Sequence, residues 1–324
     1  MTTRRQLVVG AASLAIAARV IAQPRSHRVG FIAHFEAVNR RLVQALLGGL
    51  GERGYREGRN LVLERRYTEG RQDRLPALAA DLVKLGVEVV VVGGERPALA
   101  VRAVKPTLPV VLAWSFDPVG SGLAASLAHP GGNVTGLTWD VGPEQVSKRL
   151  QVFKEAVPSI SRIALIWDPG LAGATAYWRP VNEASKALGI ETYSVEVRAQ
   201  SDLQAALDGV RRNRPGAMFV WDGPALSSQM QSIFDFAVRE RLPAFSATTL
   251  HVEQGCLLAY SADSPDLYRR AAAFVDRIFK GAKPGDLPIE QPTKFELVIN
   301  LKTARAIGLS VPQSLLLRAD RVIE

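Results

Sequence analysis

Tryptophan and aspartate stand next to each other three times in this chain of 324 residues. The pairs are Trp139-Asp140, Trp167-Asp168 and Trp221-Asp222, and they use three of the five tryptophans. An aromatic face beside a carboxylate suits small-molecule binding, because the ring supplies apolar contact area and the carboxylate fixes orientation. The pairs therefore indicate a small-molecule site. The alternative for each tryptophan is packing in the core of its own unit.

More side chains of this kind follow short apolar runs that read as strands. In open α/β sheets, ligands lie beyond the carboxyl ends of the strands, so residues just after each strand are the ones to consider. For each polar group among them, a helix N-cap or a solvated loop is the alternative. The candidate ligand-binding residues are Phe35, Glu36, Gly94, Glu95, Phe116, Asp117, Trp139, Trp167, Asp168, Asp222, Ser246 and Tyr260.

Signatures of catalysis and of metal binding are missing from the sequence. The four histidines show no paired spacing, and neither a Gly-x-Ser-x-Gly elbow nor a phosphate-binding Gly-x-x-x-x-Gly-Lys loop occurs. The segment 120–125 resembles a dinucleotide fingerprint, but it follows the fourth predicted strand instead of the first. The single cysteine, Cys256, excludes a disulfide framework and a cysteine-based metal site. We therefore expect no catalytic residue, no metal and no cofactor.

The elements that position these residues alternate between strand and helix. In the first half, strands are predicted at 28–35, 60–67, 87–92, 110–116 and 134–138, with helices at 38–53, 74–85, 98–105 and 122–128. In the second half, strands are predicted at 162–167, 191–197, 217–221 and 243–247, with helices at 145–157, 175–188, 202–212 and 225–240. The end departs from the alternation, with strands at 255–261 and 295–300, a helix at 265–280, a short helical segment from 301 and a polar-ended tail.

Such alternation predicts an α/β fold with two Rossmann-like, doubly wound parallel-sheet lobes. Because the chain recrosses near its end, we expect a hinge of several strands and a cleft between the lobes. The predicted N-terminal lobe comprises 28–136 plus 262–284, and the C-terminal lobe comprises 137–261 plus 285–324.

Composition is that of a soluble globular protein, with 47% hydrophobic and 22% charged residues. The net charge of +9 is spread along the chain, so nucleic-acid binding is not expected. Residues 1–22 carry Arg4 and Arg5, an apolar stretch and a small residue before Gln23, which is typical of an export signal of the twin-arginine type. A helical N-terminal arm is the alternative. We expect the mature protein outside the cytoplasm.

Several motifs resemble one known family from residue 28 to the end of the sequence. They are GYREGRN at 54–60, DPVGSG at 117–122, HPGGNVTG at 129–136, KRL at 148–150, ALIWDP at 164–169, KFELVINLKTA at 294–304 and PQSLLLRAD at 312–320. With these motifs the chain resembles the substrate-binding proteins of ABC transporters, in the tryptophan-type branch whose substrates are largely uncharacterised. The resemblance implies a type I periplasmic-binding fold and delivery of a small-molecule solute to an ABC permease in the inner membrane. It also implies a periplasmic, monomeric protein.

The resemblance maps the family's ligand loops onto residues already named above, from Phe35 to Tyr260. Two departures stand out: Gly94-Glu95-Arg96-Pro97 replaces a small-Thr-Pro turn, and Asp168 replaces an asparagine before Pro169. The aspartate favours a ligand donor such as an ammonium. We expect an amino acid or a small aromatic metabolite as the solute. A receptor for a membrane signalling partner is the alternative, and a nicotinamide-dependent enzyme is a less favoured one.

Overall fold

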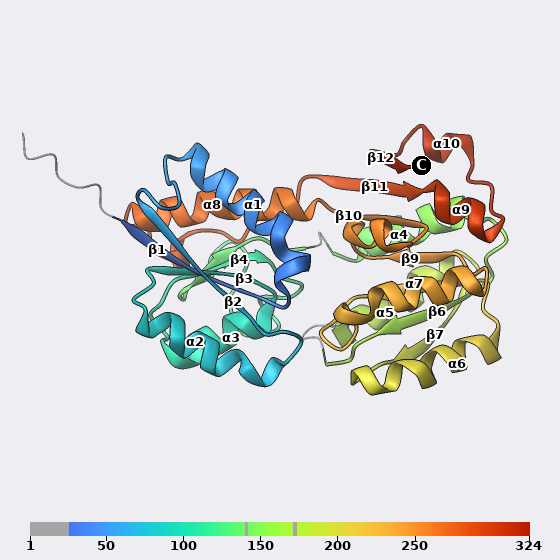
Figure 1. The fold of residues 1–324 in the computed structure, drawn as a ribbon, viewed down its shortest axis with the longest axis horizontal. Coiled ribbons are helices and arrows are strands. Elements are labelled where there is room, and N and C mark those ends of the chain that lie inside the picture. The colour runs from blue at the N-terminus through green and yellow to red at the C-terminus, as the bar shows by residue number, and fades with distance from the viewer. Residues whose placement is uncertain (1–25, 140–141, 171–173) are drawn as a thin grey trace, which may run out of the picture.

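A computed structural model describes residues 26–139, 142–170 and 174–324, and it contains two separate sheets (Figure 1). The predicted export signal at 1–22 lies outside the described residues, and so does Asp140, the aspartate of the first Trp-Asp pair. The first sheet has the order β2-β1-β3-β4-β5 and is parallel throughout. Its strands are β1 (His27–Ala33), β2 (Leu61–Tyr67), β3 (Val89–Gly93), β4 (Val110–Trp114) and β5 (Val134–Gly136).

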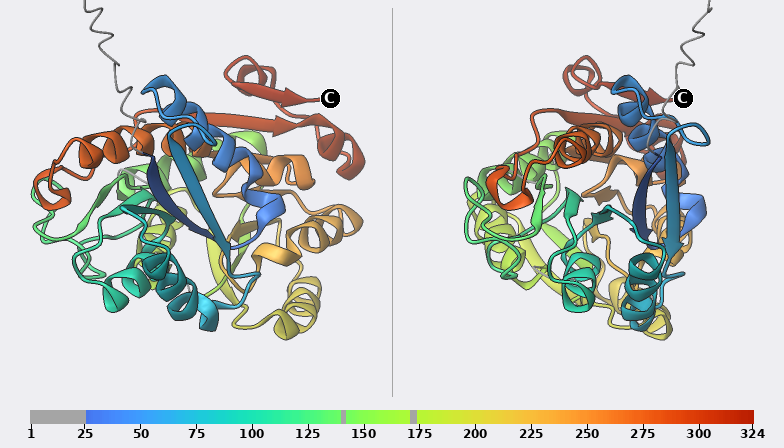
Figure 2. Two further views of the ribbon diagram at one scale, coloured as in Figure 1. Left: turned by 60° about the vertical axis from the view of Figure 1, so that its left-hand side comes forward. Right: turned by 90° about the vertical axis from the view of Figure 1, so that its left-hand side faces the viewer.

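Both faces of the first sheet are covered by helices. Strand β3 shows why, because its valines alternate between two cores: Val89 and Val91 face one, and Val90 and Val92 face the other. The first face carries α1 (Glu36–Glu52) and α8 (Ser264–Phe279), and the second carries α2 (Leu75–Lys84) and α3 (Glu95–Val104). Figure 2 shows α8, from late in the sequence, lying alongside α1.

The second sheet has the order β12-β11-β10-β9-β8-β6-β7, and β10 and β11 form its one antiparallel pair among the described residues. Its strands are β6 (Arg162–Trp167), β7 (Glu191–Glu196), β8 (Ala217–Trp221), β9 (Ala244–Ser246), β10 (Leu258–Ala262), β11 (Phe295–Asn300) and β12 (Arg321–Ile323). Helices α4 (Pro143–Ala156), α5 (Ala174–Ala187), α9 (Leu301–Ile307) and α10 (Gln313–Leu316) contribute to the core on one face. Helices α6 (Leu203–Asn213) and α7 (Met230–Arg239) cover the other face.

Short 3-10 turns complete the secondary structure of the described part. They are η1 (Gln72–Arg74), η2 (Gln200–Asp202), η3 (Ser227–Gln229), η4 (Thr249–Gln254) and η5 (Pro284–Asp286). Two of them, η3 and η4, follow β8 and β9 directly. They therefore bring residues of the second lobe to the carboxyl edge of its sheet.

The chain passes between the lobes from β5 to α4, from β10 to α8 and from η5 to β11. The last passage stays with the first lobe beyond residue 284, since Leu287 packs in the α1–α8 core and Ile289 in the α2–α3 core. The passage from β5 to α4 and the passage from η5 to β11 also pair with each other, because Leu137 forms a parallel bridge with Glu290. The predicted lobe boundaries as such stay a prediction.

One predicted helix is wrong. Residues 122–128 form turns instead of a helix, because Leu123 and Ala124 both donate their backbone N–H to the Pro118 carbonyl and Gly122 has a positive φ of 70°. Without a helix there, the 120–125 segment lacks the helix N-terminus that a dinucleotide site needs. The polar-ended tail forms a further strand, β12, which pairs in parallel with β11.

The helix predicted at 225–240 begins later, since residues 227–229 form a 3-10 turn and α7 starts at Met230.

Among the described residues, none of the helices combines the length and the apolar character that crossing a bilayer requires.

Candidate ligand-binding site

A cavity of about 150 Å³ lies between the two lobes at the carboxyl ends of their strands. The residues after β1 and β4 approach it from the first lobe, and those after β8 and β9 approach it from the second. An apolar cavity of about this volume holds a molecule the size of benzene. Its lining residues are His34, Phe35, Asn39, Leu42, Trp114, Phe116, Trp139, Trp221, Asp222, Gly223, Pro224, Ser227, Ala247, Thr248, Leu250, His251, Gln254 and Ser264.

Five aromatic side chains dominate the lining, and we call them the aromatic cluster: Phe35, Trp114, Phe116, Trp139 and Trp221. The Phe116 ring lies at the centre of the contacts. Its centroid is 5.3 Å from that of Trp114 and 6.4 Å from that of Trp139, both edge-on. It also lies 5.7 Å from Trp221, which belongs to the other lobe. The aromatic cluster therefore bridges the two sheets and offers ring faces to a ligand.

Glu95 holds the loop that carries Phe116. Its carboxylate is buried at the start of α3, and Oε1 accepts a hydrogen bond from Ser115 Oγ at 2.8 Å. The same oxygen accepts the backbone N–H groups of Phe116 at 2.6 Å and Asp117 at 2.8 Å. Three donors on one oxygen fix the backbone after β4. Glu95 therefore positions Phe116 without lining the cavity itself.

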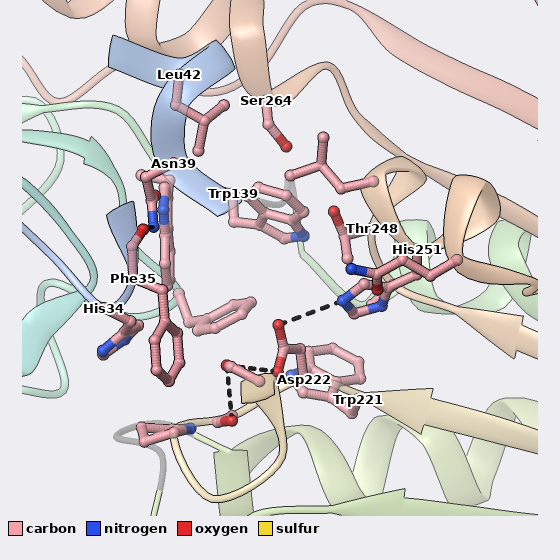
Figure 3. Close-up of a pocket in the computed structure, with 18 residues that line it drawn as sticks. His34, Phe35, Asn39, Leu42, Trp139, Trp221, Asp222, Thr248, His251 and Ser264 are labelled. Carbon is pink, nitrogen blue, oxygen red and sulfur yellow. Dashed lines mark hydrogen bonds and ion pairs between the residues drawn. The ribbon is translucent and has the colours of Figure 1, made fainter. Parts of the chain in front are cut away.

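Asp222 is the carboxylate that lines the cavity, directly after β8 (Figure 3). Its Oδ1 accepts a hydrogen bond from Ser227 Oγ at 2.8 Å, and its Oδ2 lies 3.4 Å from His251 Nε2. Burial opposes ionisation of this carboxyl group. The hydrogen bond and the charge of His251, the hydrogen bond of Ser227 and the charge of His34 outweigh burial, so the pKa of Asp222 lies below its usual range. The cavity thus contains an ionised carboxylate at neutral pH.

Ser246, His251 and Asp222 form a chain of polar contacts behind this carboxylate. Ser246 Oγ lies 2.7 Å from His251 Nδ1 and also accepts the backbone N–H of Thr248 at 3.2 Å. The set resembles a nucleophile triad in residue types, yet Ser246 is fully buried and does not line the cavity. A nucleophile has to reach its substrate. The arrangement therefore orients His251 toward Asp222.

His34 lines the cavity from the first lobe, and its ring is uncharged at neutral pH because its pKa is lowered. Burial lowers its pKa, Asp222 acts in the opposite direction, and Arg96 lowers the pKa further. Gln72 Nε2 lies 3.1 Å from His34 Nδ1.

Among the described residues of the lining, three buried polar atoms have no hydrogen-bond partner: Trp139 Nε1, Ser264 Oγ and Gln254 Oε1. Trp139 and Ser264 are 7% and 2% exposed. In Figure 3 the indole nitrogen of Trp139 is directed toward the side where Thr248 and His251 lie. Buried polar groups are nearly always hydrogen-bonded, so a bound ligand is a natural partner for these atoms.

Four of the candidate residues from the sequence line the cavity: Phe35, Phe116, Trp139 and Asp222. The others do not. Glu36 is exposed in the first turn of α1, and Gly94 is the N-cap of α3 with a positive φ of 87°. Asp117 closes its own turn, since its Oδ1 accepts the backbone N–H of Gly120 at 2.7 Å.

The remaining candidates serve the second lobe. Trp167 is buried and donates its Nε1–H to Ser194 Oγ at 2.8 Å. Asp168 accepts backbone N–H groups of Gly170 at 2.7 Å and Ala225 at 2.9 Å, so both of its oxygens hold loops. Tyr260 is half-buried and packs against the core of the second lobe. These residues are of the same types as those that line the cavity. They differ only in where their loops place them.

Sequence reasoning missed Thr248, His251, Gln254 and Ser264. The first three belong to η4 or its N-cap, in a segment whose sequence gave no strand or helix signal. Ser264 starts α8, and Ser-Pro-Asp at a helix start is a signal that could have pointed to it. In the described part of the chain, no group of three or more His, Cys, Asp or Glu side chains could hold a metal ion.

Comparison with known proteins places this geometry in a family. The family model described as ABC transporter substrate binding protein matches residues 31–323. The tyrosine-binding protein of Clostridioides difficile (strain R20291) is 20% identical over 266 residues, which cover 82% of this chain and 76% of that protein.

Two solved structures align with a TM-score of 0.85 each. A conserved domain protein from Vibrio cholerae is 26% identical and covers 92% of this chain and 99% of its own. An ABC domain in complex with L-Trp from Streptococcus pneumonia is 23% identical, and the alignment covers 92% of this chain and 100% of that chain. The predicted type I periplasmic-binding fold is thereby confirmed. The chain belongs to the ABC transporter substrate-binding protein family, whose members act outside the cytoplasm and bind a small-molecule ligand for an ABC permease.

Proposed function

We propose that this protein is a periplasmic receptor that binds an amino acid or a small aromatic metabolite between its lobes and delivers it to an inner-membrane ABC permease. The observation that carries the proposal is the cavity at the carboxyl ends of both sheets, lined by the aromatic cluster and Asp222. Rings supply apolar contact area, and the carboxylate fixes the orientation of a ligand donor.

The relatives support the same class of solute. One relative is named for tyrosine binding, and a structural neighbour contains L-Trp. The volume of about 150 Å³ admits one aromatic ring. Export through a signal at residues 1–22 by the twin-arginine route, the lobe division at 136, 262 and 284, and a monomeric state belong to this proposal.

Closure of the lobes around the solute is the step that the permease would recognise. The aromatic contact between Phe116 and Trp221 and the ion pair between Arg41 and Glu253 at 3.0 Å both join the lobes. A solute that contacts both lobes adds to these contacts and shifts the population toward the closed state. In this proposal the protein binds and releases the solute without changing it chemically.

The test is native mass spectrometry of the protein expressed with its full N-terminus and purified from the periplasm. We expect a noncovalent adduct with the mass of an amino acid or a small aromatic compound. Thermal-shift screening with a panel of such compounds covers the case in which the solute is lost during purification. No adduct and no stabilisation by any member of the panel would contradict the proposed function.

A further inference from the structure

The charge of the cavity lining sets a condition on the solute. Among the described residues that line it, Asp222 is the carboxylate and none is a lysine or an arginine. Arg149 packs over the Trp221 ring at 5.8 Å, but it is fully buried, donates its Nε–H to the Tyr260 carbonyl and does not line the cavity. Burial lowers the pKa of the lining residue His34, so this histidine is uncharged at neutral pH. The described lining therefore presents the carboxylate of Asp222, with His251 as its partner, and no lysine or arginine.

The aromatic cluster adds to the same preference. Three of its members, Trp114, Trp139 and Trp221, are indoles, whose faces attract cations more strongly than those of other aromatic side chains. Trp221 immediately precedes Asp222, so an indole and a carboxylate approach the cavity from neighbouring positions. A cation held there gains from both groups. A ligand carboxylate in the same space would face Asp222 without a lysine or arginine of the described lining to balance it.

The unpartnered donors complete the recognition pattern. Trp139 Nε1–H and the Ser264 hydroxyl are uncharged donors, and both are more than nine-tenths buried. Uncharged donors suit a phenol, carbonyl or hydroxyl oxygen of the solute. The lining thus provides an anion for one end of the solute and neutral hydrogen-bond donors for another.

We propose that the preferred solute is a monocationic aromatic amine whose ammonium group binds Asp222, whose ring lies among the aromatic cluster, and which needs no carboxylate. This inference rests on the proposed receptor function and narrows its substrate class. It separates aromatic amines from aromatic acids, which share the ring but carry the opposite charge. It also separates them from amino acids, which add a carboxylate to the amine.

The experiment is calorimetric titration with four compounds that share one hydroxyphenyl skeleton: tyramine, tyrosine, hydroxyphenylpropionate and tyrosol. We expect tyramine to bind about tenfold or more tightly than tyrosine, because tyrosine adds a carboxylate that no lysine or arginine of the described lining balances. Tyrosol, which is uncharged, should bind more weakly than tyramine, and hydroxyphenylpropionate should not bind. Tyrosine or hydroxyphenylpropionate binding as tightly as tyramine would overturn the inference.

The Asp222→Asn variant tests the residue. We expect its affinity for tyramine to fall by about tenfold to a hundredfold, while its affinity for tyrosol changes little, because a charged hydrogen bond is lost. The matched control is Asp117→Asn, which removes a carboxylate that caps a turn outside the cavity lining. It should retain tyramine affinity within about twofold.

Equal loss of tyramine and tyrosol affinity in Asp222→Asn would overturn the role of charge. If this variant does not fold, the four-compound series with the unmodified protein decides the inference alone. If a different solute co-purifies and none of the four compounds binds, the receptor function stands. In that case the inference about the amine fails, unless the solute that co-purifies is itself a cationic aromatic amine.

Discussion

At the scale of residues, two Trp-Asp pairs with the same sequence pattern have different roles. Trp167 and Trp221 are register partners on the neighbouring strands β6 and β8. Asp168 nevertheless holds two backbone N–H groups, whereas Asp222 lines the cavity and contacts His251. The pattern therefore predicts that carboxylates follow these strands. It cannot predict which one has its oxygens occupied by loop backbone, because that depends on how residues 223–225 fold back.

His34 gives a prediction about pH. The unfolded chain binds a proton at this histidine near pH 6.5, and burial lowers the pKa in the folded state. The unfolded state then binds more protons, so the free energy of unfolding falls as pH drops below about 6.5, by at most about 1.4 kcal/mol per pH unit, until the folded pKa is reached. We expect His34→Gln to reduce this loss in urea unfolding of the ligand-free protein at pH 7 and pH 5.

The control for this measurement is His129→Gln, because His129 is exposed. It should leave the pH dependence unchanged. The groups that face His34 are Thr68, Gln72, Asp222 and Arg96. The same slope in His34→Gln and in the unmodified protein would assign the acid sensitivity to other groups.

Glu95 gives a prediction about the loop after β4. Glu95→Gln retains an oxygen that can accept all three hydrogen bonds, and the other oxygen of Glu95 has no partner to lose. We expect a loss in the free energy of unfolding of about 1 kcal/mol or less for this variant. Glu95→Ala leaves the donors without an acceptor and should cost about 3 kcal/mol. Equal losses in chemical denaturation would mean that the charge, and not the acceptor, stabilises the loop.

At the scale of elements, regular hydrophobic periodicity predicted most helices and strands correctly. The wrong predictions lie in segments without regular periodicity. Strands such as β8 (Ala217–Trp221) and β11 (Phe295–Asn300) have the predicted bounds, because continuous apolar runs identify buried strands. Residues 122–128 contain enough apolar side chains to suggest a helix. Backbone bonds to Pro118 and a glycine with positive φ produce turns there instead.

The packing of α1 against α8 gives a prediction with a built-in control. A Cβ at Gly49 would lie 2.4 Å from the Arg269 carbonyl oxygen, whereas a Cβ at Gly48 would meet nothing within 4 Å. Gly49→Ala must push the helices apart, and we expect it to reduce the free energy of unfolding by about 2 kcal/mol. Gly48→Ala should instead increase it by about 0.5–1 kcal/mol through helix propensity.

Thermal and urea unfolding of both variants check this pair. Two glycines that are adjacent in sequence should act with opposite sign, because only one faces the neighbouring helix. A stabilising Gly49→Ala would show that α1 and α8 do not pack as closely as the structure describes.

At the scale of the whole molecule, sequence alternation predicted two parallel-sheet lobes, and the two sheets bear this out. The composition of the cavity could be predicted only in part. Phe35, Phe116, Trp139 and Asp222 follow strands and line the cavity, but Ser264 and the η4 residues reach it through the return of the chain between lobes. Contacts between segments so far apart in sequence have no local signal.

The most direct test of the central claim is whether a solute occupies the cavity between the lobes. Thr248→Trp places a large side chain in the cavity, and Thr107→Trp places one on an exposed turn outside its lining. Calorimetric titration with the solute identified by mass spectrometry should give one molecule bound per chain in the unmodified protein and in Thr107→Trp. It should give no binding in a folded Thr248→Trp variant. Equal binding in all three proteins would contradict the account.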